Sequence, residues 1–129
     1  MSQFPMTDSR RSILERIPDY EVRVTATDSL INVRYGDLLI ADTTSALLIH
    51  ETRHGDVYYL PPKDIDWSLL EPTELSTYCP FKGHASYWSL KGEDTLENFV
   101  WSYRNPYPEV EELKDYMSFY TDRVEVKAG

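Results

Sequence analysis

The chain has 129 residues, of which 13 are basic and 22 acidic, giving a formal net charge of -9. This length fits one domain, and the acidic balance predicts repulsion from a phosphate backbone, which disfavours nucleic acid as a partner. The chain lacks the run of about 18 apolar residues that a membrane-spanning helix needs, so no membrane anchor or membrane partner is expected. Cys79 is the single cysteine. It excludes an internal disulfide and fits a reducing compartment, so we expect a cytoplasmic protein.

The first 19 residues are polar and carry Pro5 and Pro18, with Ile13, Leu14 and Ile17 at helix-like spacing. This pattern predicts an N-terminal arm or a short helix over residues 1–19. Residues 20–129 are expected to form the single domain.

Alternating apolar and polar residues dominate the rest of the chain, which is the pattern of half-buried strands. Gly36-Asp37 predicts a hairpin turn, His54-Gly55-Asp56 predicts another turn, and 63–71 is interpreted as a turn or a single helical turn. The expected strands are 20–26, 31–35, 38–41, 45–51, 57–60, 84–89 and 98–103, with 124–126 as a last short strand.

One segment, 108–120, has a helical pattern. Pro108 suits the first turn of a helix, and the acidic residues that follow it suit the positive end of the helix dipole. Apolar residues recur there at helical spacing, at Val110, Leu113, Met117 and Tyr120. We therefore predict a mainly β domain of α+β type, with about seven strongly bent antiparallel strands and this C-terminal helix packed on the sheet.

The run 77–88 is the best candidate for a functional site, because it places Cys79, Lys82 and His84 within a dozen residues. Cys79 precedes a proline, which favours an extended or turn conformation, and Gly83 permits a sharp reversal. After Gly83 the residues alternate as in a strand. The reactive side chains are therefore expected on a loop that a following strand holds rigid.

These elements, in this order, resemble the domain-of-unknown-function family 427, for which a nucleotidyltransferase-like label is also in use. The resemblance runs from about residue 22 to residue 126, and its most specific part is Cys-Pro-x-Lys-Gly at 79–83. Its other carriers are Ala41-Asp42-Thr43 leading to Ala46-Leu47 and Glu51, Tyr58-Tyr59-Leu60-Pro61 with Asp64, the rest of 77–88, Trp101-Ser102-Tyr103 with Pro106, and Phe119-Tyr120. The resemblance implies a small, mostly antiparallel β domain with a flanking helix, and it implies no established activity.

Glu51, Cys79 and Lys82 are the catalytic candidates. Cys79 beside a cation would have a more nucleophilic thiolate, but a lone cysteine also serves as a small buried apolar residue. Lys82 could bind an anionic group or pair with a buried Glu51. Glu51 ends an apolar strand, so its carboxylate needs a partner if it is buried, either Lys82 or loop amides.

No metal site is predicted. His50, His54 and His84 show no metal-ligand spacing with Cys79, and His84 by itself fits a strand histidine as well as a base. Asp64-x-Asp66 is the one feature that would suit magnesium-dependent nucleotidyl transfer, but the chain has no glycine-rich phosphate-binding motif beside it. No cofactor follows from the motifs.

Two main hypotheses about function follow, from different classes of protein, and a third is less favoured. The first is a small-molecule pocket, either binding or enzymatic, and the second is a protein-interaction module in which the motif is structural and an acidic surface or an edge strand makes the contact. The third is a nucleotidyltransferase-like enzyme. A homodimer through an edge strand is compatible with the first two. The ligand-binding candidates are Glu51, Tyr59, Cys79, Lys82, Tyr87 and Trp101.

Overall fold

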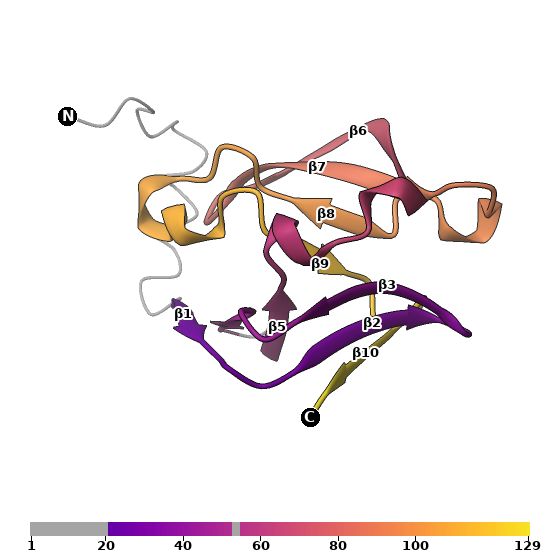
Figure 1. Cartoon of the computed structure of the whole chain (residues 1–129). Helices are drawn as coiled ribbons and strands as arrows, with labels where there is room; N and C mark the ends of the chain where they lie inside the picture. The colour runs from indigo at the N-terminus through magenta and orange to yellow at the C-terminus, as the bar shows by residue number, and fades with distance from the viewer. Residues whose placement is uncertain (1–20, 53–54) are drawn as a thin grey trace.

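The computed structural model describes residues 21–52 and 55–129, and this part of the chain forms ten strands in three antiparallel sheets (Figure 1). The first sheet has the order β1-β4-β5 and the second β10-β2-β3, while the third, four-stranded sheet has the order β6-β7-β8-β9. The strands are β1 (Val22–Ala26), β2 (Ile31–Tyr35), β3 (Leu38–Thr43), β4 (Leu47–Glu51), β5 (Gly55–Tyr59), β6 (Leu70–Cys79), β7 (Gly83–Leu90), β8 (Val100–Ser102), β9 (Met117–Phe119) and β10 (Glu125–Ala128).

Short 3-10 turns lie in the connections between strands, and two isolated bridges add contacts between segments outside the strand ladders. In Figure 1 the four-stranded sheet forms the upper layer and the sheet of β2, β3 and β10 the lower layer. Leu60 and Met117 exchange backbone hydrogen bonds of 2.8 Å in both directions, which joins the end of β5 to β9. A second bridge joins Ala41 of β3 to Ile65. The turns are η1 (Pro62–Asp64), η2 (Trp67–Leu69), η3 (Asp94–Leu96) and η4 (Pro108–Leu113).

The buried apolar side chains divide into two clusters. The first cluster combines side chains of the second and third sheets with residues that flank the strands. Its members include Ile31, Val33, Ile40, Leu60, Leu90, Phe99, Val100, Met117 and Phe119. The second is smaller and rich in tyrosine, with Ile49, Tyr59, Ala85, Tyr87, Tyr103, Val110 and Leu113. Because tyrosine hydroxyls are polar, a cluster that contains three of them must direct them to partners or to an opening.

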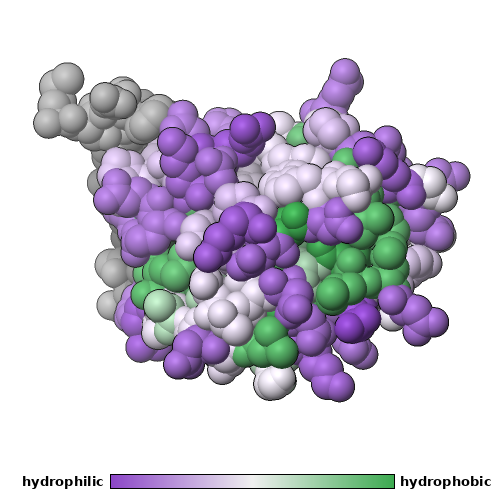
Figure 2. Space-filling view, in the orientation of Figure 1, coloured by the Kyte–Doolittle hydropathy of each residue, from purple (hydrophilic) through white to green (hydrophobic). Residues whose placement is uncertain are grey.

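Hydrophilic side chains cover much of the face seen in Figure 2, and the largest group of apolar side chains lies towards the right of that view, with smaller groups at the left and the bottom. Across residues 21–52 and 55–129, no helix has the length and apolar character needed to cross a membrane.

The predicted helix at 108–120 is wrong. Only the 3-10 turn η4 forms at its start, with non-helical angles at Val110 (φ -132°, ψ 35°), and Asp115 has a φ of 64°. The amide of Met117, which an α-helix would bond to Leu113, instead donates to the carbonyl of Leu60. Tertiary pairing therefore converts the end of this segment into β9, and the helical spacing of its apolar residues reflects burial alone.

The strand prediction was mainly right about position and wrong about number. The hairpin of β2 and β3 forms around Gly36-Asp37, and η1 and η2 occupy the predicted turn region. The structure adds β6 and β9, neither of which alternates clearly, and β6 carries a register shift between Pro72 and Ser76. The predicted strand 98–103 shortens to β8. The expectations for 1–19 and for the turn at His54 lie outside the described residues.

Candidate functional site

The loop that carries Lys82 is a tight connection between β6 and β7. The Lys82 amide donates to the carbonyl of Cys79 at 3.2 Å, and the Lys82 carbonyl accepts from the Tyr107 amide at 2.9 Å. Gly83 has a φ of 117°, and a Cβ there would lie 3.5 Å from the backbone oxygen of Asn105. Glycine is needed because side chains avoid this conformation. The loop is thus held against 105–107, and Cys79 belongs to β6, contrary to the prediction that it lies in the loop.

Lys82 and Glu51 form a buried ion pair. The Lys82 Nζ contacts the Glu51 Oε1, and the side chains of the two residues are only 8% and 11% exposed, respectively. Glu51 is positioned at the end of β4, opposite Val22 of β1 and Gly55 of β5. Of the alternatives for Lys82, the structure therefore shows the pairing with Glu51, which compensates each charge for its loss of water.

A pocket of about 230 Å³ opens beside this ion pair. The first and third sheets supply its walls, with Val57 and Tyr59 from β5 facing Tyr87 from β7 and Trp101 from β8. The described residues that line it are Ile49, Glu51, Val57, Tyr59, Lys82, Tyr87, Trp101, Tyr103 and Tyr120. We call it the inner pocket. It brings together Glu51, Tyr59, Lys82, Tyr87 and Trp101 of the predicted ligand-binding residues, but Cys79 does not line it.

Most polar atoms of the aromatic walls have partners. The Trp101 Nε1 donates to the Tyr59 hydroxyl at 3.2 Å, and the two rings meet edge to face at 6.3 Å. The Tyr87 hydroxyl lies 2.8 Å from the Thr77 Oγ1. These bonds hold the rings in place, which keeps the inner pocket open instead of letting the side chains collapse into it.

Tyr103 differs from the other wall residues. Its side chain is 7% exposed and its ring lies 6.5 Å from that of Tyr59. Within the described residues no hydrogen bond reaches its hydroxyl. Burial is the main cause that raises the pKa of Tyr103 and that of Tyr59 well above the ordinary value. Both hydroxyls therefore keep their protons at neutral pH, and Tyr103 has a donor available to a molecule in the inner pocket.

Tyr120 was not predicted as a site residue. It lines the inner pocket, and burial, followed by a hydrogen bond with Tyr87, raises the pKa of Tyr120 to about 12. Sequence reasoning placed it on a helix, where no pairing with Trp101 of β8 could be anticipated. Tyr103 is also absent from the predicted ligand-binding residues, because the sequence does not show which aromatic side chains face a pocket.

Cys79 and His84 do not form a catalytic pair with each other in this arrangement. Cys79 is half-buried and packs against the second cluster. The His84 side chain is exposed, and its ring lies 5.0 Å from that of Tyr78 on the neighbouring strand β6. His84 is therefore a surface strand residue.

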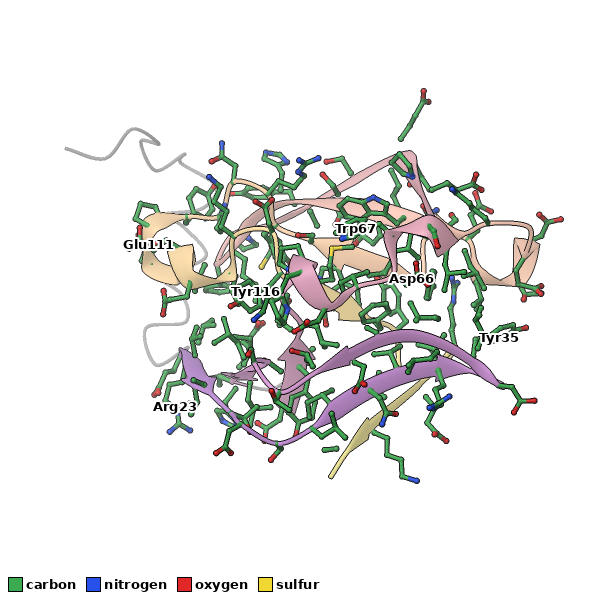
Figure 3. The ribbon with its side chains drawn as sticks, in the orientation of Figure 1. Arg23, Tyr35, Asp66, Trp67, Glu111 and Tyr116 are labelled. Carbon is green, nitrogen blue, oxygen red and sulfur yellow. The ribbon has the colours of Figure 1, made fainter. Side chains whose placement is uncertain are left out.

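The carboxylates of Asp64 and Asp66 both accept hydrogen bonds from neighbouring residues. The Asp64 Oδ2 accepts from the Thr43 hydroxyl at 2.6 Å, and the Asp66 Oδ1 accepts from both the amide and the hydroxyl of Ser68. Asp66 caps η2 in this way, and Figure 3 shows it with Trp67 on the connection between β5 and β6. In the described residues, no group of three or more His, Cys, Asp or Glu side chains could hold a metal ion.

A larger hollow of about 530 Å³ adjoins the inner pocket, with Val57, Trp101 and Tyr120 in the walls of both. We call it the outer hollow. The described residues that line it are Asp56, Val57, Tyr58, Leu60, Trp101, Phe119, Tyr120, Thr121, Asp122 and Val126. The two spaces together have the size range of a small-molecule site.

Alkaline pH is expected to destabilise the fold through Tyr59 and Tyr103. Their folded-state pKa values are raised, so the stability they contribute is complete below the unfolded value of about 10 and is lost as the pH rises past it. The expected slope is up to about 1.4 kcal/mol per pH unit for each tyrosine. Urea unfolding between about pH 8 and pH 11 measures this slope, and Tyr103→Phe should make it shallower. An unchanged slope in Tyr103→Phe would contradict the assignment.

The fold and the site together define a small β domain with a tyrosine-lined pocket between two of its sheets. The chain belongs to the family described as Domain of unknown function (DUF427), whose family model matches residues 23–128. This confirms the resemblance that the order of motifs indicated. No curated protein matches the chain significantly.

Proposed function

We propose that this protein binds a small organic molecule in the inner pocket. The observation that carries the proposal is the Tyr103 hydroxyl, a donor without a partner among the described residues, in a side chain that is 7% exposed and lines a pocket of about 230 Å³. A ligand that accepts from this hydroxyl gains a hydrogen bond without breaking one that the described residues make.

The chemistry of the walls of the inner pocket restricts the class of ligand that fits it. Tyr59, Tyr87 and Trp101 present aromatic surface that suits a planar molecule. The Tyr103 hydroxyl requires a hydrogen-bond acceptor, such as a carbonyl or hydroxyl oxygen. Lys82 is the one cation among the described lining residues, and Glu51 compensates its charge, so these residues do not favour a polyanion. A planar molecule that carries an oxygen acceptor and no phosphate fits these walls.

Binding can be tested with a thermal-shift screen of small aromatic hydroxyl, carbonyl and amide compounds, together with nucleotides with and without magnesium. A compound at a hundredfold excess over its dissociation constant is expected to stabilise the fold by about 2.7 kcal/mol. In Tyr103→Phe the affinity for that compound should fall about fivefold, because one hydrogen bond is lost.

Tyr35→Phe is the matched control for this screen, because Tyr35 carries the same group at the end of β2 and lines neither space. It should leave the shift unchanged. A compound that stabilises wild type and Tyr103→Phe equally would place its site elsewhere, and a nucleotide hit that requires magnesium would favour the nucleotidyltransferase-like reading.

A protein-interaction module remains the second candidate because of one observation. Strand β6 pairs only with β7 in the described part of the chain, and it exposes Leu75 (42%) and Tyr78 (41%). An open strand with apolar side chains is suited to adding a strand from a partner or from a second copy. If the screen finds no ligand, a concentration-dependent mass that Leu75→Lys abolishes would support this candidate.

A further inference from the structure

The outer hollow differs from the inner pocket in its chemistry. Among the described residues, its walls combine aromatic side chains with two carboxylates, Asp56 and Asp122, and contain no lysine, arginine or histidine. The inner pocket, by contrast, contains the compensated pair of Lys82 and Glu51. The described walls of the outer hollow are therefore more negative than those of the inner pocket, where the two charges compensate each other.

Trp101 and Tyr120 form the wall that the two spaces share. Their ring centroids lie 4.6 Å apart at an interplanar angle of 47°, so the two rings make an angled aromatic surface. Aromatic faces attract cations through the ring quadrupole, and tryptophan does so most strongly. The Tyr120 ring already attracts one cation, since the Arg123 guanidinium lies 5.8 Å from its centroid. Arg123 does not line the outer hollow.

The carboxylates lie in the same hollow as these rings. The Asp56 Oδ1 lies 2.6 Å from the His50 Nδ1, which compensates it only when His50 is protonated. Asp122 takes part in no ion pair within the described residues. The net charge of -9 adds a long-range attraction for positive ligands. Charge and ring faces thus favour the same kind of occupant.

We infer that the outer hollow holds an organic ammonium group, so that the ligand of this protein is an organic cation. The inference rests on the proposed function, since it places the planar, acceptor-bearing end of the ligand in the inner pocket and its cationic end beside Trp101 and Tyr120. A hollow of about 530 Å³ is far larger than a bare metal ion needs. Its aromatic walls suit an alkylated ammonium, which is large and weakly hydrated.

The test compares choline with 3,3-dimethylbutan-1-ol, which has the same shape without the charge. Neither probe carries a planar group, and a variant of Asp122, which lines the outer hollow and not the inner pocket, assigns the binding to the outer hollow. Binding is followed by the indole resonances of isotope-labelled full-length protein, in which Trp67 and Trp88 are internal references outside the hollow. Choline should shift the Trp101 indole resonance saturably with a dissociation constant in the millimolar range, and the neutral probe should bind at least about tenfold more weakly.

Asp122→Asn removes the unpaired carboxylate with little change of shape and should weaken choline binding about threefold or more. Asp37→Asn is the matched control, because Asp37 is an exposed carboxylate in the turn between β2 and β3 and lines no part of the hollow. It should leave the binding curve unchanged.

Three results would overturn the inference. They are equal binding of the two probes, a choline affinity that Asp122→Asn leaves unchanged, and a Trp101 resonance that choline does not move. None of these results bears on the inner pocket, whose ligand binding is judged by Tyr103→Phe. A screen hit that depends on Tyr103 while choline fails would retain the proposed function and remove only the cationic end of the ligand.

Discussion

Replacing Lys82 by methionine is expected to lower the free energy of unfolding by roughly 3–5 kcal/mol, the cost of breaking a buried ion pair on one side. Methionine keeps most of the length of the side chain but leaves the Glu51 carboxylate, 11% exposed, without this cation. The backbone bonds of Lys82 to Cys79 and Tyr107 remain possible. The loss should therefore come from electrostatics and not from collapse of the loop. Urea unfolding at neutral pH measures it.

Two further variants test whether the loss of stability comes from the ion pair between Lys82 and Glu51. Lys63→Met changes an exposed lysine in the same way and should alter stability by no more than about 0.5 kcal/mol. In the double variant Glu51→Gln with Lys82→Met, neither charge remains, so it should be more stable than the sum of the single changes predicts, by about 1–3 kcal/mol. If the single effects simply add, the two side chains do not interact in the folded protein.

Replacing Phe99 by alanine is expected to cost about 3–5 kcal/mol, through lost apolar burial and the cavity that remains. Phe99 is fully buried in the first cluster, and its ring lies 5.8 Å from that of Phe119 on β9. Its carbonyl accepts from the amide of Tyr120 at 3.0 Å, so it lies directly beside a wall residue of both spaces. The midpoint of urea unfolding should fall, and the fold should remain cooperative.

Leu75→Ala is the comparison for Phe99→Ala. Leu75 is 42% exposed on β6, so its truncation should cost no more than about 0.5 kcal/mol. Phe99→Leu, which keeps much of the buried volume, should fall between the two. Equal losses for Phe99→Ala and Leu75→Ala would mean that the cluster around Phe99 and Phe119 is not a close-packed core.

Some of the site residues were recognisable because their local sequence constrains them. Cys79-Pro80 with Gly83 requires a tight reversal at that point, and the alternation after Gly83 requires a strand, whatever the rest of the chain does. That is why Lys82 and Tyr87 could be named in advance. Glu51 could be named because a carboxylate at the end of an apolar strand needs a partner, although its 31-residue separation from Lys82 left that partner open.

Other residues depend on contacts between segments that are distant in sequence. The wall of Trp101 and Tyr120 exists because β9 pairs with β8, and β9 exists because Met117 bonds to Leu60 instead of continuing a helical turn. The local pattern of 108–120 is compatible with a helix, and tertiary hydrogen bonds override it. The role of Tyr103 likewise follows only from its place in the inner pocket, because the sequence does not show that its hydroxyl lacks a partner among the described residues.

By itself, the sequence determined the family, the mainly β character and the loop that carries Lys82, because strand alternation and proline and glycine constraints act over a few residues. Only the tertiary structure decided that ten strands form three sheets, that Lys82 meets Glu51, and that a tyrosine-lined pocket adjoins an acidic, aromatic hollow. These features arise from pairing between distant strands, whose free energy depends on burial and hydrogen bonds that no short stretch of sequence contains.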